Sequence, residues 1–413
     1  MATTAPDRIV TLDIVRGVAV MGILFMNITG FAMPEPAYMN PRAFGGAQGL
    51  DLAVYVADFI LVDGKMRGLF SLLFGASLLL VVERAEAGGL DPARVHYSRM
   101  VWLLVFGLVH LWAIWWGDIL TLYAVIGMIA YAFRGRSPER LISAAATLIL
   151  IQWAIAATVP LGIDATARAL REAAADPGAQ QAWDSMVRGF GVPPASWTEA
   201  RLALMRGGYG PIALDRLRAH FTTPVTSAIF VGPETLGYML LGMAALKSGF
   251  LGGEWPAARY RRVALAGFAI GIAGYGAIAV WLMASDYTMR AVAMGVIALT
   301  VPLRPPMIAG WAALIILAVR PGGTLATRIA ATGRMAFTNY LCTSLICTTL
   351  FYGYGFGWFG RVTRAELLVV VIAVCAAMLG WSKPWLARFR YGPLEWLWRS
   401  AARGRAQPMR GEA

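Results

Sequence analysis

Charged residues are scarce in this chain. Asp, Glu, Lys and Arg together make up 14% of its 413 residues, whereas a soluble domain carries about 25%. Hydrophobic residues account for 58%, and the mean hydropathy is +0.61. Apolar stretches of about 20 residues, the length that crosses a bilayer, recur along the chain. This composition excludes a soluble globular protein and predicts an all-α, polytopic transmembrane helix bundle.

Cysteine and histidine are equally rare, with three residues of each. Cys342, Cys347 and Cys375 lie in apolar stretches and form no C-x-x-C pair, which is typical of small packing residues. The sequence contains no metal-ligand spacing and no Walker, G-x-S-x-G or H-E-x-x-H motif, and its one G-x-G-x-x-G, at 355–360, follows no predicted strand. We therefore expect no metal site and no tightly bound cofactor.

Acidic residues are outnumbered, because 23 Asp and Glu oppose 36 Lys and Arg and leave a net charge of +13. In a soluble protein such an excess would suggest nucleic acid. Here the basic residues lie in short loops and in the tail, where they orient the protein and meet anionic headgroups. We expect the lipid bilayer, and not nucleic acid, as the partner.

Ten segments have the length and hydropathy of membrane spans. They cover residues 14–31, 66–82, 100–116, 119–133, 139–162, 226–247, 262–284, 306–319, 335–352 and 364–381. Two shorter apolar pieces, 52–63 and 288–303, could span, re-enter the membrane or lie at its interface. The predicted fold is about ten spans with one or two re-entrant or interfacial helices.

Basic residues orient this bundle. In a ten-span arrangement most of the basic groups between spans fall on one side, which the positive-inside rule makes cytoplasmic. These groups are Arg8, Arg84, Arg94, Arg99, Arg134, Arg136, Arg140, Lys247, Arg259, Arg261, Arg262, Arg320, Arg328 and Arg334, with a basic tail from Lys383 to Arg410. Both termini are then cytoplasmic.

We divide the chain into four parts, one of which is the hydrophilic insertion at residues 163–222. We predict an N-terminal transmembrane bundle at 1–162, which carries most of the polar motifs, and a C-terminal bundle at 223–382. The insertion falls on the outer side, where short amphipathic helices are expected to cover the outer mouth. Residues 383–413 form a basic cytoplasmic tail.

The first span is unusual because it keeps the charged residues Asp13 and Arg16 and the amide of Asn27. Asp13 and Arg16 are three residues apart and therefore neighbours on one helix face. Asn27 follows Arg16 by about three helical turns on nearly the same face. One interpretation is an ion pair that anchors the helix at the surface, with Asn27 joining two helices. The other is a polar route in which Arg16 binds an anionic cofactor group such as a phosphate.

Further polar residues precede the second span and interrupt the third and fourth. Lys65 and Arg67 follow an Asp-Gly turn, on the outer side by the ten-span count, where they could hold a substrate oxyanion or take part in interfacial salt bridges. His110 lies inside the third span, where an imidazole can serve as a base, an acyl acceptor or a proton relay. Asp118 could orient His110, or it could cap the fourth span by accepting from the Thr121 N–H.

Two later spans also contain polar residues. Glu234 follows Pro233 in the sixth span, and a carboxylate beside a proline that frees a backbone carbonyl indicates a cavity or a partner base. Asn339 and Tyr340 open the ninth span, where they join helices or contact a substrate. These residues complete a candidate site of catalytic and binding groups.

Several of these stretches together resemble the YeiB family of polytopic bacterial inner-membrane proteins, a domain of unknown function. The resemblance rests on Leu12–Ile23, Gly64–Gly75, His110–Tyr123, Gly333–Tyr340 with Phe351–Gly355, and Tyr391–Arg399. It covers nearly the whole chain and implies a multi-pass protein of a bacterial inner membrane.

The Asp-x-x-Arg-Gly pattern of the first helix also resembles the transmembrane acyltransferase superfamily. This resemblance implies transfer of an acyl group from cytosolic acyl-CoA to an acceptor, with an intramembrane or lumenal-side histidine at the centre. Arg16, with Asp13 beside it, would then lie on the acyl-CoA path. The lysosomal heparan-α-glucosaminide N-acetyltransferase of that superfamily has its histidine between the first two spans. Residues 34–65 here contain none, so His110 would replace it.

Three functions remain open at this stage. The first is an acyl-CoA-dependent acyltransferase acting on a small-molecule, lipid or sugar acceptor, with His110, Asp118 and Glu234 as catalytic groups. The second is a proton-coupled transporter or permease, because intramembrane Asp, Glu, His and Arg also serve proton-coupled carriers. The third is a non-catalytic lipid-binding protein. Many small residues in the helices would permit a homodimer.

Overall fold

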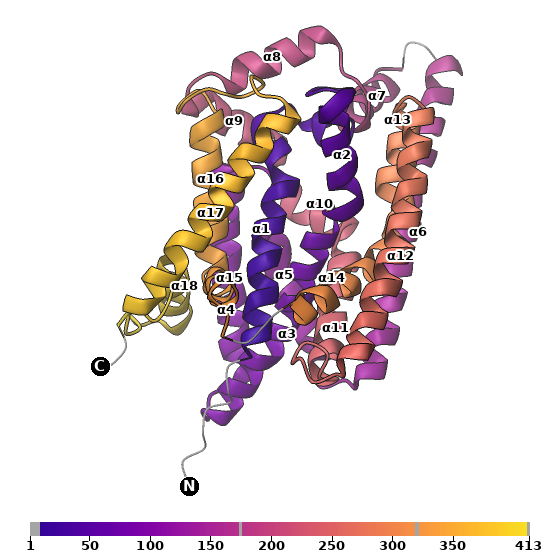
Figure 1. The fold of residues 1–413 in the computed structure, drawn as a ribbon. Helices are drawn as coiled ribbons and strands as arrows, with labels where there is room; N and C mark the ends of the chain where they lie inside the picture. The colour runs from indigo at the N-terminus through magenta and orange to yellow at the C-terminus, as the bar shows by residue number, and fades with distance from the viewer. Residues whose placement is uncertain (1–8, 173–175, 319–321, 411–413) are drawn as a thin grey trace.

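The computed structural model describes residues 9–172, 176–318 and 322–410, and within these residues it contains helices and no strands. Arg8 and Arg320, which the orientation argument used, lie outside the described residues. Most helices run side by side along one axis, and short helices cover one end (Figure 1). The predicted all-helical fold is confirmed.

The helices follow the predicted apolar segments closely. They are α1 (Val10–Ala32), α2 (Gly49–Leu61), α3 (Lys65–Ala87), α4 (Pro92–Val109), α5 (Leu120–Ala130), α6 (Pro138–Glu172), α7 (Pro177–Phe190), α8 (Ala195–Met205), α9 (Tyr209–His220), α10 (Thr223–Phe230), α11 (Gly232–Lys247), α12 (Ala257–Ala284), α13 (Met289–Val292), α14 (Arg304–Ala318), α15 (Thr324–Arg334), α16 (Ala336–Phe351), α17 (Arg364–Arg388) and α18 (Pro393–Arg403).

Seven helical stretches in the described residues are long and apolar enough to cross a membrane. The bent pair formed by α10 and α11 adds an eighth. The two remaining predicted spans correspond to shorter apolar helices, Leu120–Phe133 and Ala336–Phe351. Every one of the ten predicted segments is therefore helical, although two of them fall below the usual spanning length.

The two shorter apolar pieces are not separate elements. Residues 52–63 continue into the second predicted span as one stretch, Gly49–Ala87, and residues 288–303 continue into the eighth as Met289–Ala318. The first stretch is interrupted at Gly64, whose φ of +72° suits a residue without a Cβ. The second passes through a π-helical segment, Ala293–Leu299, and a short 3-10 turn before α14. These interruptions leave the chain direction unchanged, so neither piece adds a span.

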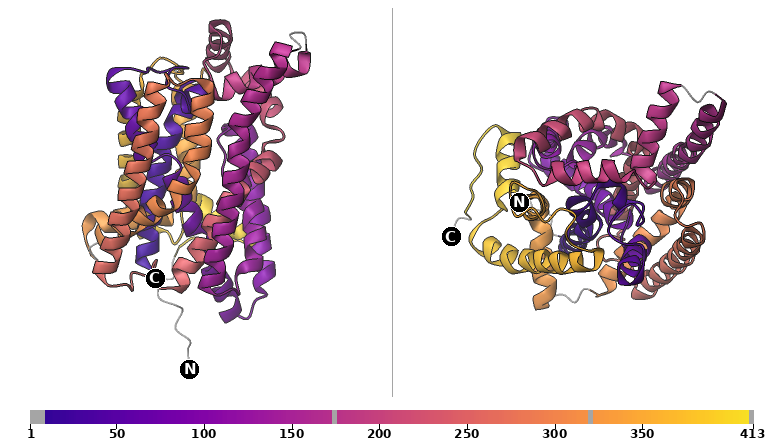
Figure 2. Two further views of the ribbon diagram at one scale, coloured as in Figure 1. Left: turned by 90° about the vertical axis from the view of Figure 1, so that its right-hand side faces the viewer. Right: turned by 90° about the horizontal axis from the view of Figure 1, so that it is seen from above.

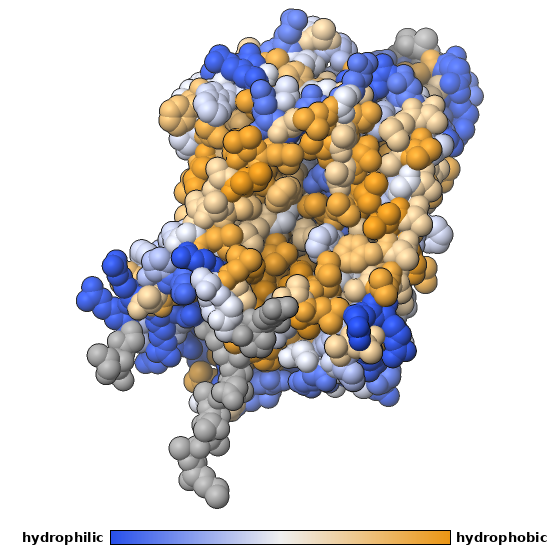
Figure 3. Space-filling model, in the orientation of Figure 1, coloured by the Kyte–Doolittle hydropathy of each residue, from blue (hydrophilic) through white to orange (hydrophobic). Residues whose placement is uncertain are grey.

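The two ends of the bundle differ in chemistry. The insertion helices α7, α8 and α9 lie across one end, here called the insertion end, and α6 continues to Glu172 past the predicted boundary at residue 162 (Figures 1 and 2). The start of α1 and the helix α18 lie toward the opposite end, here called the basic end. Between the ends, the visible surface is an apolar belt (Figure 3). This arrangement fits a protein that spans a bilayer.

The helix α1 lies inside the bundle and joins its two halves. It contacts α3 from the N-terminal half and α14, α15, α16 and α17 from the C-terminal half. The predicted bundles at 1–162 and 223–382 therefore interlock around one core. The helix α1 also contacts α15, a helix that the sequence did not predict. Their backbones lie very close together at Gly333, where an added Cβ would lie 1.9 Å from the Asp13 carbonyl oxygen.

Candidate functional site

His110 is the centre of a buried hydrogen-bonded group. Its Nδ1 lies 2.8 Å from Asp118 Oδ1, and its Nε2 lies 2.9 Å from the Ser344 hydroxyl. The side chains of His110 and Asp118 are fully buried, and Ser344 is 1% exposed. His110 begins a π-helical segment, His110–Ile114, at the end of α4. Such segments are rare and are frequent at functional sites.

Asp118 performs both of the roles that the sequence left open. Its Oδ2 accepts from the Thr121 N–H at 2.8 Å and from the Thr121 hydroxyl at 2.7 Å, at the start of α5. Its Oδ1 faces His110. A carboxylate in this position favours the imidazole tautomer with hydrogen on Nδ1, which leaves the Nε2 lone pair free to accept from Ser344.

A small cavity lies between α1 and α16 and borders Ser344. Its lining consists of Val20, Ile23, Leu24, Asn27, Phe31, Tyr340, Thr343 and Ser344. Asn27 is half-buried here, and the Tyr340 ring lies 5.2 Å from the His110 ring. The structure thus brings together four of the predicted site residues: His110, Asp118, Asn27 and Tyr340.

Asn339, although adjacent to Tyr340, points elsewhere. Its amide nitrogen donates to the Thr332 carbonyl at 3.1 Å and to Ser382 Oγ at 3.2 Å. Its amide oxygen accepts from the Trp381 indole at 3.0 Å. These bonds tie α16 to α15 and α17, which matches the helix-joining role considered for Asn339 and not substrate contact.

Glu234 is the centre of a second buried group, separate from His110. Its carboxylate accepts from Arg67, from Arg304 at 2.8 Å and from the Tyr238 hydroxyl at 2.7 Å. The Glu234 side chain is 1% exposed, and those of Arg67 and Arg304 are 17% and 11% exposed. The Glu234 carboxylate is therefore paired with two guanidinium groups. Asp118, and not Glu234, is the carboxylate that orients His110.

Lys65 lies at a different depth from the predicted one. The ten-span count placed it at the outer surface, but it is fully buried at the junction of α2 and α3, inside one continuous spanning stretch. Its ammonium donates to the Phe59 carbonyl oxygen and lies 3.2 Å from the centre of the Tyr275 ring. The prediction was wrong in depth because residues 52–63 form the other half of the same span.

Asp13 and Arg16 lie near the basic end of α1, away from the His110 group. Arg16 Nη1 lies 3.1 Å from Asp13 Oδ1, and Nη2 donates to the Ser77 hydroxyl of α3 at 2.7 Å. The Arg16 side chain is 23% exposed. The ion pair predicted from the three-residue spacing is present within α1, and the Arg16–Ser77 hydrogen bond joins α1 to α3.

The helix α5 connects the two buried groups. Near its start Thr121 bonds to Asp118, and two residues later the Tyr123 hydroxyl lies 2.7 Å from Ser71 Oγ and donates to the Arg67 carbonyl at 3.1 Å. Tyr123 is fully buried. A single helix therefore positions the partner of His110 and the backbone next to the Glu234 group.

Two important residues escaped the sequence analysis. Ser344 is an ordinary serine in an apolar helix, and its contact with His110 spans 234 residues. Arg304 lies between the two apolar segments 288–303 and 306–319 and was assigned to neither. A charged residue between two such segments was the available signal, because a charge at membrane depth is costly.

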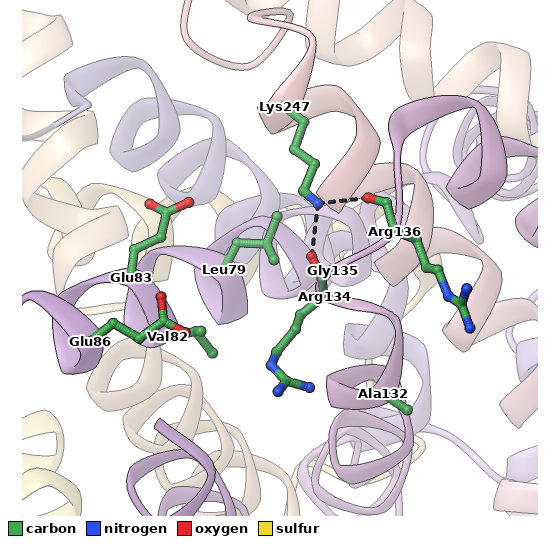
Figure 4. Close-up of a pocket in the computed structure, with 9 residues that line it drawn as sticks. All are labelled: Leu79, Val82, Glu83, Glu86, Ala132, Arg134, Gly135, Arg136 and Lys247. Atoms are coloured by element: carbon green, nitrogen blue, oxygen red, sulfur yellow. Dashed lines mark hydrogen bonds between the residues drawn. The ribbon is translucent and has the colours of Figure 1, made fainter. Parts of the chain in front are cut away.

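A pocket at the basic end does not border either buried group. It has a volume of about 530 Å³ and is lined by Leu79, Val82, Glu83, Glu86, Ala132, Arg134, Gly135, Arg136 and Lys247 (Figure 4). Lys247 Nζ donates to the carbonyl oxygens of Arg134 and Arg136, at 2.7 Å each. This lysine therefore holds the loop after α5 in place.

The comparisons with known proteins give the family. The chain is 33% identical to the "Uncharacterized protein YeiB" of Escherichia coli over 97% of this chain and 98% of that protein. The chain belongs to the YeiB family. It is also 32% identical to the "Uncharacterized protein YxaH" of Bacillus subtilis, over 98% of this chain and 97% of that protein.

A family model, "Protein of unknown function (DUF418)", matches residues 245–405 of this YeiB-family chain. That region contains Arg304, Asn339 and Ser344, whereas His110 and Asp118 lie outside it. A third relative, the "Uncharacterized 39.9 kDa protein in amylase 3'region" of Bacillus acidopullulyticus, is 24% identical over 98% of this chain and 96% of that protein. No solved structure matches the chain.

Proposed function

We propose that this YeiB-family protein is a membrane-embedded acyltransferase that moves an acyl group, such as acetyl, from acyl-CoA to a hydroxyl or amine acceptor. The observation that carries the proposal is the alignment of Ser344, His110 and Asp118 through distances of 2.9 and 2.8 Å. A hydroxyl, an imidazole and a carboxylate in this order are the parts of an activated nucleophile.

The chemistry proceeds in two balanced steps. In the first, Ser344 Oγ attacks the thioester carbonyl while His110 Nε2 takes the hydroxyl proton. The carbon–sulfur bond breaks, and His110 returns the proton to the sulfur, which leaves as free CoA thiol. In the second, His110 takes a proton from the acceptor, which attacks the acyl-Ser344 ester. The ester bond between the acyl carbon and Ser344 Oγ breaks, and His110 returns the proton to Ser344 Oγ. Asp118 stabilises the imidazolium in both steps.

Other predicted residues have places in this proposal. Asn27 lines the cavity beside Ser344, where its amide N–H groups would donate to the oxyanion that forms on the acyl carbonyl. Arg16, part-exposed near the basic end, would meet the phosphates of acyl-CoA. The proposal places the basic end and both termini in the bacterial cytoplasm, where acyl-CoA is found.

Acyl capture by the purified protein tests the proposal. We expect acetyl-CoA labelled in its acetyl group to modify Ser344, as located by mass spectrometry of peptides. Ser344→Ala and His110→Ala should each reduce the rate of acetyl transfer about 10³-fold or more, in line with loss of a nucleophile or its base.

A matched substitution separates chemistry from packing. Ser382→Ala removes another fully buried serine hydroxyl, on α17, and should keep wild-type acetylation. Failure of the wild-type protein to take up any acyl group would overturn the proposal. Label that persists in Ser344→Ala but disappears in His110→Ala would move the acyl group to the imidazole and remove the role of Ser344.

A proton-coupled transporter is the second candidate, and the interrupted helices favour it. Transporter sites lie near the bilayer midplane between discontinuous helices, and here α10 and α11 form a broken pair bent by 64° beside the buried Glu234. This candidate predicts solute uptake into proteoliposomes that is independent of acyl-CoA and insensitive to Ser344→Ala. Absence of acyl capture together with such uptake would favour it over the acyltransferase.

A further inference from the structure

Three long helices begin at one point inside the bundle. The helix α3 starts at Lys65, α11 at Gly232 and α14 at Arg304. Arg67 in the first turn of α3 and Arg304 at the start of α14 both bond to Glu234 in the first turn of α11. A Cβ at Gly64 would lie 2.9 Å from Arg304 Nε, so α3 and α14 begin almost in contact. The N-termini of α3 and α11, each with partial positive charge, therefore converge beside Arg304 of α14.

Side chains add to the positive charge at this point. Lys65, Arg67 and Arg304 all come from the first turns of these helices, and each is buried or nearly so. The Glu234 carboxylate lies between the two guanidinium groups and is held by Arg67, Arg304 and Tyr238. Glu234 thus occupies the position that an anion would take in a site built from two arginines and helix N-termini.

Unpaired polar atoms border the same point. Among the described residues, the Tyr275 hydroxyl and Arg304 Nε are buried and neither makes a hydrogen bond of good geometry, although the two side chains lie within reach of each other. Tyr275 is fully buried on α12, and its ring contacts the Lys65 ammonium. Buried donors without a partner are costly, and they commonly mark a position that a water or ligand fills. This observation is independent of the helix N-termini.

We propose that these residues form a binding site for one carboxylate or phosphate group, and that Glu234 is its built-in occupant. An incoming anion replaces the Glu234 carboxylate between Arg67 and Arg304 and takes additional donors from Tyr275 and Arg304 Nε. The inference does not require acyl transfer at Ser344, since it rests on other residues.

The charge balance of the buried site makes replacement of the Glu234 carboxylate by an anion depend on a proton. A second anion beside the Glu234 carboxylate would add an uncompensated charge in a low-dielectric interior, which is strongly unfavourable. If Glu234 takes up one proton, it becomes neutral and the anion restores the original balance. Binding is therefore coupled to uptake of one proton.

Other titratable and charged groups surround the site. They are Asp58 on α2, Asp63 at the junction of α2 and α3, Lys65 and Arg67 on α3, Tyr123 on α5, Tyr238 on α11, Tyr275 on α12, Arg304 on α14, and Tyr38 in the short 3-10 turn after α1. The three cations Lys65, Arg67 and Arg304 are matched in number by three carboxylates, Asp58, Asp63 and Glu234. Glu234 is the carboxylate bonded to both arginines, which is why the proton is assigned to it.

Anion-dependent stabilisation of the full-length protein tests the proposal. The protein is dissolved in a non-ionic detergent without chloride. It is titrated with sodium phosphate or sodium acetate while the unfolding temperature is measured. For the wild-type protein titrated with acetate, which stays a monoanion near neutral pH, we expect the apparent affinity to rise about tenfold for each pH unit of acidification, since one proton enters with the anion. Glu234→Gln should bind the anion at least about tenfold more tightly than wild type at pH 7.5, without this pH dependence.

Matched variants keep the test decisive. Arg304→Gln should lose anion binding, and Arg304→Lys should retain it with reduced affinity, so the result does not depend on one variant folding. Arg201→Gln is the control, because Arg201 also pairs with two carboxylates, Glu35 and Asp215, but at the insertion end. Ser344→Ala should bind anions as the wild type does, which separates this site from acyl transfer.

A further measurement distinguishes a lipid headgroup from a free anion as the ligand. Stabilisation by phosphatidic acid in the micelle, and not by free phosphate or acetate, would identify a lipid headgroup as the ligand. If Glu234→Gln is stabilised by phosphate or acetate no more than the wild type, and phosphatidic acid likewise shows no preference for it, the cluster is only an internal ion pair. That outcome would overturn the proposal.

Discussion

Single residues in this protein carry more than one function. Asp118 caps the start of α5 with one oxygen and orients His110 with the other. The sequence predicted both roles, because the spacing to Thr121 is that of a cap and the carboxylate follows His110 by eight residues. Ser344 could not be found in this way, since nothing near it in the sequence indicates a distant imidazole.

The double role of Asp118 gives a stability prediction. Asp118→Ala removes a helix cap and leaves the buried His110 N–H without an acceptor, for a loss of about 2–4 kcal/mol in the free energy of unfolding. Asp184→Ala is the control, because Asp184 is exposed on α7, and it should change stability by less than about 0.5 kcal/mol. Thermal or denaturant unfolding in detergent provides the measurement. Equal stability of the two variants would contradict the buried geometry.

At the level of elements, the interruptions of the helices determine where the chemistry lies. Gly64 and the turn before Gly232 create helix N-termini in the middle of the bundle, where an uninterrupted helix would expose only side chains. The sequence showed both breaks, as an Asp-Gly turn and as Pro233. It did not show that residues 52–63 and 66–82 share one direction, and this error placed Lys65 at the surface.

The crossing of α1 and α15 allows a prediction at the element level. At Gly333 an added Cβ would lie 1.9 Å from the Asp13 carbonyl oxygen, so Gly333→Ala must separate the two helices and should cost about 1–3 kcal/mol. Gly380 is also helical but has no atom within 4 Å of the corresponding position. Gly380→Ala should therefore leave stability unchanged or raise it by up to about 1 kcal/mol. Unfolding temperatures of the two variants, measured side by side, decide the point.

For the whole molecule, the apolar belt and the two polar ends require a membrane orientation (Figure 3). The excess of basic residues at one end predicts that this end is cytoplasmic. The interlocked halves also imply that neither bundle buries its core alone, because α1 packs against four helices of the C-terminal half.

Cysteine labelling in intact cells tests this orientation. In a variant without the native cysteines, Ser137→Cys at the basic end should resist a membrane-impermeant maleimide until the membrane that holds the protein is opened. Ser185→Cys on α7 should react once the reagent reaches the outer side of that membrane. Both serines are exposed in the structure, so accessibility is matched. Labelling in the reverse order would show that the basic end faces outward.

The sequence by itself determined the helical class, the apolar segments, the Asp13–Arg16 pair and the contact between His110 and Asp118. These follow from local rules, because bilayer thickness fixes helix length and a charge in an apolar segment needs a partner within a few residues or a function. Only the tertiary structure decided that Ser344 completes the His110 group and that Arg304 joins Arg67 at Glu234. Those contacts span 234, 70 and 167 residues. These contacts depend on how the helices pack. The sequence of one helix does not specify which side chain of another helix will face it.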